Sequence, residues 1–352
     1  MKNVKLNMYL KQNLGDDLFL KVILERYPNT VFHIQSDINY KKTFLKKYKN
    51  VKIYQGMKNK IINFIYFITK QNKKMFHYIK NKCDLMITLG GSMFIEKNKS
   101  EELLKKELEH LYLNDYKPYY IIGSNFGPYQ NSYYKKIYES IFLKAEVVNF
   151  REEYSHNLFK NINHVHFYPD VVFSLNKDYI EVKNKKEVTI SVMNIKKDAY
   201  YEKMIELIHF FLKKNYQINL VSFCKYEGDE KAIQKIMNQL DNKEKIHIYN
   251  YRGNIDKILK VIAQSKIVVA TRFHACVLGL LFNKTVIPIS YSNKTLNVLK
   301  DLKFKGKIID INKIEEFNIA KLTEDDLNYR LNIDNQIQEA NKHFNELDKV
   351  LK

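Results

Sequence analysis

Short apolar runs alternate with longer amphipathic stretches along most of the chain. In the first half, the apolar runs predict strands at residues 4–9, 31–34, 51–54, 85–89, 119–122 and 147–150. Helical periodicity follows at residues 18–26 and from residues 101, 129 and 152 onward. This alternation of strands and helices predicts an α/β fold with a parallel sheet.

The second half repeats the pattern after residues 177–186, a charged stretch without periodicity that is typical of a linker. Strands are predicted at residues 188–193, 218–223, 246–248, 266–270 and 285–289, and helices at residues 200–215, 227–240 and 255–264. A chain of 352 residues is too long for one ordinary core. We therefore expect domains at residues 1–176 and 187–320, and a polar helical tail at residues 321–352 that packs back on them.

Small or charged residues follow three predicted strands of the first half. The carboxyl ends of parallel strands share one edge of a sheet, and ligands bind in the crevice outside that edge. Glycine there lets the backbone approach a ligand closely, although any one glycine can equally serve a turn. Arg151 is either an anion clamp or a solvent-facing residue at the start of a helix. The residues of this edge are Gly90, Gly91, Ser92, Ser124, Asn125, Gly127 and Arg151.

The second half carries a cationic segment at residues 271–294. Arg272 and His274 follow the predicted strand at residues 266–270, and Tyr291 and Lys294 follow the next strand. All four side chains are expected at one sheet edge. Two fixed cations beside a titratable imidazole suit an anionic substrate whose chemistry needs a proton.

A third group of candidate residues lies between the first strand and the first helix. The segment contains Asn13, Gly15, Asp16 and Asp17. A helix N-terminus after a glycine-bearing turn offers outward-facing N–H groups to an anion or a sugar. The single glycine does not make a dinucleotide-binding fingerprint. The two carboxylates fit either a catalytic role or capping of the helix.

Composition narrows the class of protein. The chain has 59 Lys and Arg against 39 Asp and Glu, a net charge of +20, which favours anionic partners. The lysines are spread along predicted helices, where a solvated face is the default explanation. The aromatic residues lie within apolar runs and form no stacking platform for nucleic acid. Three widely spaced cysteines predict a reduced protein without a zinc site, and Cys276 reads as a small buried hydrophobe.

The sequence also bears on location. No apolar run reaches the length of about 18 residues expected of a transmembrane helix, and the N-terminus is too polar for a signal peptide. We therefore expect a cytoplasmic protein. The basic, aromatic-rich stretch at residues 58–82 fits either a core-packing helix or one that docks at the inner face of the cell membrane.

Taken together, the motifs resemble the polysaccharide pyruvyl transferase family. They occur in the order Asn13-Leu-Gly-Asp-Asp17, Gly90-Gly-Ser92, Gly123-Ser-Asn-Phe-Gly-Pro128, Arg151-Glu-Glu-Tyr-Ser155, Pro169-Asp170 and Arg272-Phe-His274, with Tyr291 and Lys294 downstream. The family often has three glycines at the second motif and commonly leucine where Phe273 stands. The resemblance implies a fold like that of the GT-B glycosyltransferases, with two Rossmann-like domains facing each other across a cleft.

The resemblance also implies an activity. Family members move the enolpyruvyl unit of phosphoenolpyruvate onto sugar hydroxyls, usually as a cyclic ketal, during the synthesis of cell-surface polysaccharide. Phosphoenolpyruvate is then the donor substrate, and no cofactor or metal is required. His274, Asp17 and Arg272 become the candidate catalytic residues. Donor binding falls to Arg151, Arg272, Tyr291 and Lys294. Acceptor binding falls to Asn13, Gly15, Asp16, Gly90, Gly91, Ser92, Ser124, Asn125 and Gly127.

Two alternatives remain open. A GT-B glycosyltransferase that uses a nucleotide sugar would share the fold and the strand-end loops. A non-catalytic saccharide- or membrane-binding scaffold would explain the net charge and the basic stretch at residues 58–82. The expected partners are phosphoenolpyruvate, a saccharide or lipid-linked oligosaccharide, and an anionic membrane surface, but not nucleic acid.

Overall fold

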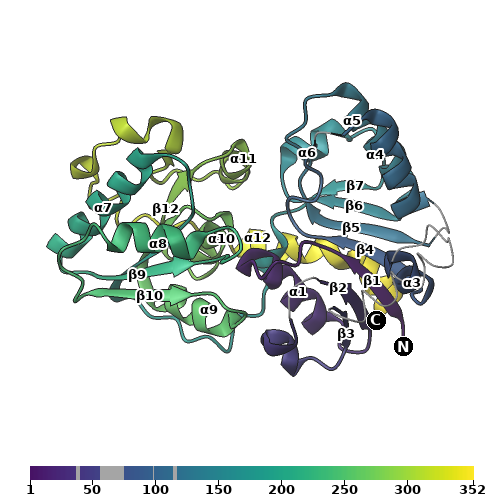
Figure 1. Cartoon of the computed structure of the whole chain (residues 1–352), viewed down its shortest axis with the longest axis horizontal. Coiled ribbons are helices and arrows are strands. Elements are labelled where there is room, and N and C mark those ends of the chain that lie inside the picture. Colours follow the sequence, from purple (N-terminus) through teal and green to yellow (C-terminus); the bar gives the residue numbers. More distant parts are fainter. Residues whose placement is uncertain (37–39, 56–74, 98, 114–116) are drawn as a thin grey trace. The chain divides into compact units, whose positions relative to one another are not determined.

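The computed structural model describes residues 1–36, 40–55, 75–97, 99–113 and 117–352. The chain folds into two compact units (Figure 1). The first unit comprises residues 1–11, 19–174 and 338–352, and the second comprises residues 12–18 and 175–337. The sequence had placed residues 12–18 in the first domain, whereas in the structure they pack with the second unit.

The first unit is built on a parallel seven-stranded sheet. The strand order is β3-β2-β1-β4-β5-β6-β7, so the order reverses at the neighbours β1 and β4. The strands are β1 (Asn3–Asn7), β2 (Val31–Gln35), β3 (Val51–Tyr54), β4 (Leu85–Leu89), β5 (Tyr119–Ser124), β6 (Val147–Phe150) and β7 (Val165–Phe167). The predicted strands of this half are confirmed. The strands β4, β5 and β6 are buried along their whole length, as continuous apolar runs predict.

Helices connect these strands. They are α1 (Leu14–Arg26), α3 (Met75–Asn81), α4 (Glu101–Leu108), α5 (Ser132–Phe142) and α6 (Glu153–Leu158). Ser100 caps α4 by accepting a hydrogen bond from the backbone N–H of Leu103. Aromatic rings from the strand-end loops and from α5 pack together, with Phe126 and Phe142 each 4.9 Å from Phe159 between ring centroids. Of the stretch predicted at residues 58–82, residues 58–74 lie outside the described residues.

The second unit has a parallel six-stranded sheet with the order β10-β9-β8-β11-β12-β13. Its strands are β8 (Lys185–Val192), β9 (Gln217–Ser222), β10 (Ile246–Asn250), β11 (Ser265–Ala270), β12 (Thr285–Ser290) and β13 (Ile309–Asp310). The helices are α7 (Asp198–Lys213), α8 (Asp229–Met237), α9 (Ile255–Gln264), α10 (Phe273–Leu281) and α11 (Asn293–Asp301). The prediction for α9 is exact, whereas β13 and α11 had not been predicted.

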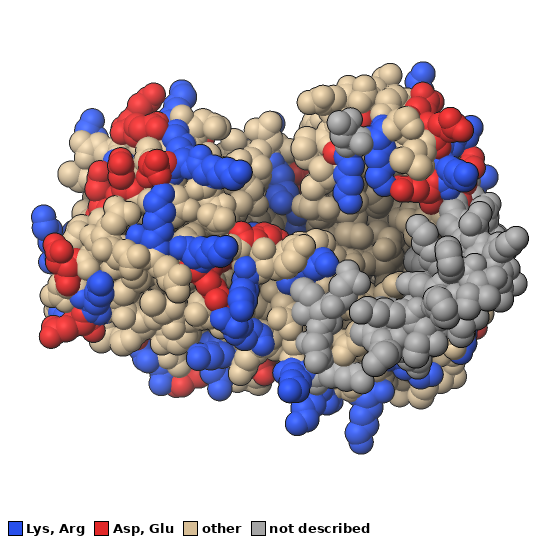
Figure 2. Space-filling model, in the orientation of Figure 1, with Lys and Arg blue, Asp and Glu red and all other residues tan. Residues whose placement is uncertain are grey.

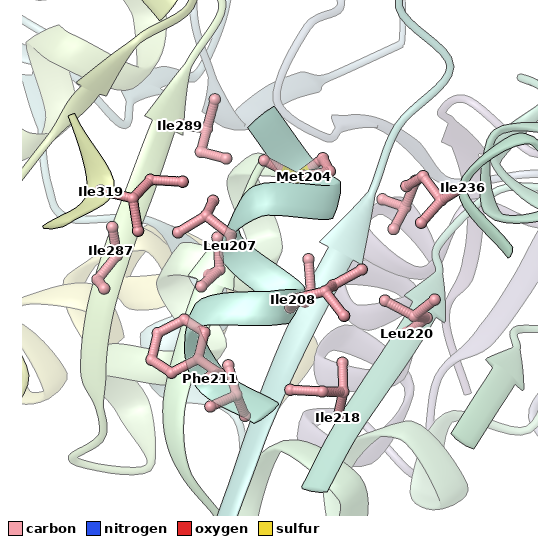
Figure 3. Packing of buried hydrophobic residues seen from close by; sticks show 14 of the residues in the cluster. Met204, Leu207, Ile208, Phe211, Ile218, Leu220, Ile236, Ile287, Ile289 and Ile319 are labelled. Atoms are coloured by element: carbon pink, nitrogen blue, oxygen red, sulfur yellow. The ribbon is translucent and has the colours of Figure 1, made fainter. Parts of the chain in front are cut away.

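One face of this sheet is sealed by α7. Met204, Leu207 and Ile208 of α7 are fully buried against apolar side chains of β9 and β12 (Figure 3). Figure 3 also shows Ile236 of α8 beside the same layer. Burying each such side chain contributes about 1.5–3 kcal/mol relative to leaving it exposed. The amphipathic pattern of residues 198–213 therefore fixes which face of α7 meets the sheet.

The C-terminal tail contains less helix than predicted. Its helices are α12 (Asp334–Ala340) and α13 (Asn345–Leu351), and much of residues 322–333 is irregular. Residues 338–352 belong to the first unit. There Asp348 accepts hydrogen bonds from Arg26 Nε at 3.0 Å and from the Tyr27 hydroxyl at 2.7 Å. His343 is buried, and its Nε2 lies 2.8 Å from the carbonyl oxygen of Pro169.

The charged side chains and the cysteine lie where this core predicts. Lysine and arginine side chains are scattered among acidic and uncharged residues on the face shown in Figure 2. Cys276 is buried within α10, as predicted, and burial raises the pKa of its thiol to about 12. Among the described residues, no helix combines the length and the apolar character needed to span a membrane.

We predict that His343 makes the first unit acid-sensitive. Burial lowers its pKa to about 4, against an ordinary value of 6.5, so the folded state holds the neutral form. The stabilisation is complete above pH 6.5 and is lost as the pH falls towards 4. Urea unfolding at pH 7.5 and pH 5 should show an acid loss about 2 kcal/mol smaller in His343→Gln than in the unchanged chain. Equal acid losses in the two proteins would contradict the assignment.

Candidate active site

The strand order of the second unit reverses between β8 and β11, which are parallel neighbours with Ser191 paired to Ala270. In open parallel sheets, ligands bind outside the carboxyl ends of the strands at such a switch point. Arg272 follows β11 at this point and is the N-cap residue of α10. Its backbone N–H donates to the Ser191 hydroxyl at 3.0 Å, which ties the two strand ends together. The sequence-predicted pair Arg272 and His274 therefore starts α10 at the switch point.

The Arg272 side chain is held by two carboxylates. Its Nε donates to Asp229 at 3.1 Å, its Nη2 also donates to Asp229, and its Nη1 donates to Glu227. Burial alone would lower the pKa of Arg272, but Asp229 and Glu227 raise it, so the guanidinium stays charged. The residue is 7% exposed. These contacts use three of the five N–H donors of a guanidinium, which leaves two for a ligand.

Asp229 is the fixed point of this arrangement. It is fully buried, and besides Arg272 it accepts from the backbone N–H groups of Phe223 and Cys224, each at 3.0 Å. Those two residues form the turn that leaves β9. Burial raises the pKa of Asp229, and the four donors that converge on the carboxylate oppose this shift. Asp229 therefore orients Arg272 relative to the end of β9.

The segment at residues 12–18 completes the site from the same unit. The Asn13 side-chain amide donates to Glu227 at 3.1 Å, and the Leu14 N–H donates to the carbonyl of Phe223 at 3.0 Å. The Asn13 side-chain oxygen also accepts from the N–H of Gly15 at 3.0 Å, so Asn13 serves the first turn of α1. The predicted acceptor residues Asn13, Gly15 and Asp16 therefore lie in the same unit as the predicted donor residues Arg272, Tyr291 and Lys294, whereas Arg151 lies in the first unit.

Gly15 lies directly against His274. A Cβ atom built on Gly15 would stand 2.0 Å from Nδ1 of the imidazole, which is closer than any real contact. The absence of a side chain at position 15 thus determines where the half-buried His274 ring sits.

Two further carboxylates differ in exposure. Asp17 is fully buried and accepts a hydrogen bond from the Tyr251 hydroxyl at 2.6 Å, whereas Asp16 is half-buried in the same turn of α1. This hydrogen bond links the segment at residues 12–18 to the rest of the second unit.

Lys294 and Tyr291 follow β12. Lys294 lies in the first turn of α11, and its Nζ lies 5.9 Å from the ring centroid of Phe273. The ammonium therefore reaches the start of α10, next to the residue that precedes His274. Tyr291 packs at the margin of the apolar core of the unit. The structure thus brings Arg272, His274 and Lys294 to one region of the second unit.

The predicted edge of the first unit is assembled around Arg151. Gly90 follows β4, and its carbonyl accepts from the Ser124 hydroxyl at 2.7 Å. The Asn125 N–H donates to the carbonyl of Gly91 at 2.7 Å. A Cβ on Gly91 would lie 2.2 Å from the Arg151 guanidinium carbon. Gly90 and Gly127 have positive φ angles of 128° and 96°, and Ser92 is exposed.

Arg151 is buried, as Arg272 is, but is even less exposed. Its Nη1 donates to Asp170 at 2.8 Å, and its Nη2 donates to the side-chain oxygen of Asn125 at 2.9 Å. Arg151 is 1% exposed and Asp170 is fully buried. This geometry favours a structural role for Arg151 over the predicted contact with a donor anion.

The sequence alone indicated no role for Glu227, Asp229 or Tyr251. Asp170 appeared there only within the motif Pro169-Asp170. A local signal existed for the first two, since an acidic pair flanking Gly228 follows the strand β9. Tyr251 gave no such signal, because it reads as an ordinary apolar position. Within the described residues, no group of three or more His, Cys, Asp or Glu is arranged to hold a metal ion.

Comparison with known proteins decides the family. The profile of the polysaccharide pyruvyl transferases matches residues 13–293. This chain belongs to the polysaccharide pyruvyl transferase family. The matched range contains every predicted site residue except Lys294, which follows it directly. The amylovoran biosynthesis protein AmsJ of Erwinia amylovora is 20% identical over 287 residues, which is 73% of this chain and 68% of AmsJ.

Solved structures of other proteins share the fold of this family member. The UDP-GlcNAc 2-epimerase of Methanocaldococcus jannaschii, in complex with UDP-GlcNAc and UDP, matches with a TM-score of 0.62 and 11% identity over 99% of each chain. Anabaena HepE in complex with UDP and glucose matches with a TM-score of 0.55 and 10% identity over 100% of this chain and 99% of that one. The prediction of two Rossmann-like, GT-B-like units is thereby confirmed.

We predict that Arg151→Met destabilises the first unit by about 3–5 kcal/mol, because it leaves Asp170 buried without its cation. Urea unfolding measures the loss. The double variant Arg151→Met with Asp170→Asn should recover part of it, since no carboxylate charge then remains buried. A stable Arg151→Met protein with weakened binding of phosphoenolpyruvate would instead support the donor-clamp prediction.

Proposed function

We propose that this protein transfers the enolpyruvyl unit of phosphoenolpyruvate to two hydroxyls of a saccharide and forms a cyclic pyruvate ketal. The observation that carries the proposal is the position of Arg272 and His274, motif residues of a pyruvyl transferase family member, at the switch point of the second unit. The relative AmsJ bears a name from amylovoran biosynthesis, which supports a role in making extracellular polysaccharide.

The donor needs cations because it carries a carboxylate and a phosphate. The two guanidinium N–H groups of Arg272 beyond its bonds to Asp229 and Glu227 are available to one of these groups. Lys294 supplies a second positive charge beside the start of α10. The N-terminus of α10, a helix of nine residues, adds backbone N–H groups and the positive end of its dipole.

The proton chemistry falls to His274. Ketal formation begins with proton transfer to the methylene carbon of the donor, which makes C2 electrophilic. One hydroxyl adds to C2 and loses its proton, phosphate leaves with the C2–O bond electrons, and the second hydroxyl adds and loses its proton. An imidazole titrates near neutrality and can deliver the first proton and accept a later one. Asp17 is proposed to assist, through its place in the segment whose Gly15 contacts the imidazole.

The residues proposed for acceptor binding in the first unit are Gly90, Gly91, Ser92, Ser124, Asn125 and Gly127. Those proposed in the second unit are Asn13, Gly15 and Asp16. No cofactor or metal takes part in this scheme. A lipid-linked acceptor would bring the protein to the inner face of the cell membrane, and the basic stretch at residues 58–82 is the proposed contact there.

A glycosyltransferase reaction with a nucleotide sugar is the second candidate. It is favoured by the fold likeness to proteins solved with UDP-GlcNAc, UDP and glucose. A thermal-shift screen separates the two, because a ligand that binds only the native state raises the melting temperature. Stabilisation by phosphoenolpyruvate but not by UDP- or GDP-sugars supports the pyruvyl transferase. The reverse pattern supports the glycosyltransferase.

We predict that His274→Gln lowers the kcat of acceptor-dependent phosphate release from phosphoenolpyruvate by about 10²–10⁴-fold, the usual contribution of a general acid–base residue. The melting temperature should change little. His209→Gln, at an exposed position of α7, is the matched control and should keep full activity. Mass spectrometry of the acceptor should show the pyruvate adduct with the control and not with His274→Gln. Near-normal turnover by His274→Gln would reject the assignment.

A further inference from the structure

The first unit carries a surface hollow that the reaction scheme does not use. It has a volume of about 370 Å³, and its lining includes Glu96, Lys97, Tyr129, Gln130, Asn131 and Tyr133. They come from the loops that follow β4 and β5, which are parallel neighbours, except for Tyr133, which lies in the first turn of α5. The hollow therefore lies on the carboxyl side of the sheet, where such sheets bind ligands.

Hydrogen bonds hold the two walls of the hollow together. The Glu96 N–H donates to the carbonyl of Pro128 at 3.0 Å, and the Gly127 N–H donates to the carbonyl of Phe94 at 2.7 Å. The Glu96 carboxylate accepts from the backbone N–H groups of Gln130 and Asn131 and, at 2.7 Å, from the Asn131 side-chain amide. The site is thus formed before a ligand arrives, which reduces the entropy cost of binding.

The far wall is fixed in the same way. The Tyr133 hydroxyl donates to the carbonyl of Lys99 at 2.8 Å. The Tyr129 ring packs 5.2 Å from Phe126 and stacks on Tyr134. Both lining tyrosines are half-buried, so each combines a supported ring with a surface open to solvent.

The lining is chemically mixed. Tyr129 and Tyr133 supply aromatic surface, and Glu96, Gln130 and Lys97 supply acceptors and donors. The hydrogen bond from the N–H of Gln130 and those from Asn131 lower the pKa of Glu96, so the wall carries a carboxylate at neutral pH. The lining also includes Lys99, so two ammonium groups accompany the carboxylate. The supported aromatic rings and the several polar groups together suit a ligand with an apolar C–H face and several hydroxyls. That description fits a pyranose ring.

We propose that this hollow binds a pyranose residue of the saccharide acceptor. The two loops that form the hollow also form the edge that contains Gly91 and Asn125. A chain of sugars can therefore extend from the edge into the hollow. The identity of this sugar as part of a substrate rests on the proposed function, but its binding does not.

The test measures saccharide binding without phosphoenolpyruvate. Isothermal titration with lactose and with cellobiose is performed on the unchanged chain, on Tyr129→Leu with Gln130→Ala, and on the control Tyr179→Leu. Tyr179 is an exposed tyrosine of the second unit. Loss of the aromatic face alone should weaken binding about 2- to 12-fold, and loss of the Gln130 side chain should add to this, while the control stays unchanged.

Several results would overturn the proposal. They are failure of the unchanged chain to bind either disaccharide, equal binding by the double variant, and equal weakening of inorganic phosphate or UDP binding in that variant. Kinetics then separates this proposal from the proposed function. If pyruvate is transferred and the double variant keeps the acceptor KM, the hollow is wrong and the function stands. If the double variant loses saccharide binding but phosphoenolpyruvate gives no product, the function is wrong and the hollow stands.

Discussion

The ion pair between Arg272 and Asp229 fixes the carboxyl edge of the second unit. Asp229 also accepts two backbone N–H groups from the turn after β9, so the guanidinium, that turn and the start of α10 hold one geometry. Glu227 extends the arrangement to Asn13, and the segment at residues 12–18 then brings Gly15 against His274. Removing one partner of a buried pair leaves an uncompensated charge and costs about 3–5 kcal/mol. The position of the proposed acid–base residue thus depends on a pair that does not itself transfer a proton.

The first unit also contains an arginine–aspartate ion pair after a strand, but we assign its arginine a different role. Arg151 also follows a strand and also pairs with an aspartate, but it is 1% exposed and is covered by Gly91. Arg272 is 7% exposed, bonds to two carboxylates, and stands at the start of α10 beside His274. Two arginines at equivalent places in the sequence pattern are therefore assigned different roles. Arg151 supports the edge that is proposed to meet the saccharide, and Arg272 is proposed to hold the donor.

Much of the fold could be predicted because it depends on local pattern. Buried parallel strands need continuous apolar runs, and those runs were visible at nearly every strand, as was the exact extent of α9. The order of the motifs was enough to indicate the family. The pairing of distant side chains could not be read in this way. No local sequence pattern shows that Tyr251 donates a hydrogen bond to Asp17 or that Asp170 pairs with Arg151. Nor does one show that residues 12–18 belong to the second unit. The tail was overpredicted as helix because polar periodicity alone does not fix where a helix begins.

The most direct test of this account is a kinetic double-mutant cycle on Arg272→Lys and Asp229→Asn. The quantity measured is kcat/KM for phosphoenolpyruvate, from phosphate release at saturating acceptor, with pyruvate transfer checked by mass spectrometry. If Asp229 acts by positioning Arg272, each single variant loses activity and the double variant is no worse than Arg272→Lys. Losses that multiply in the double variant would show that the two residues act independently and would contradict the account.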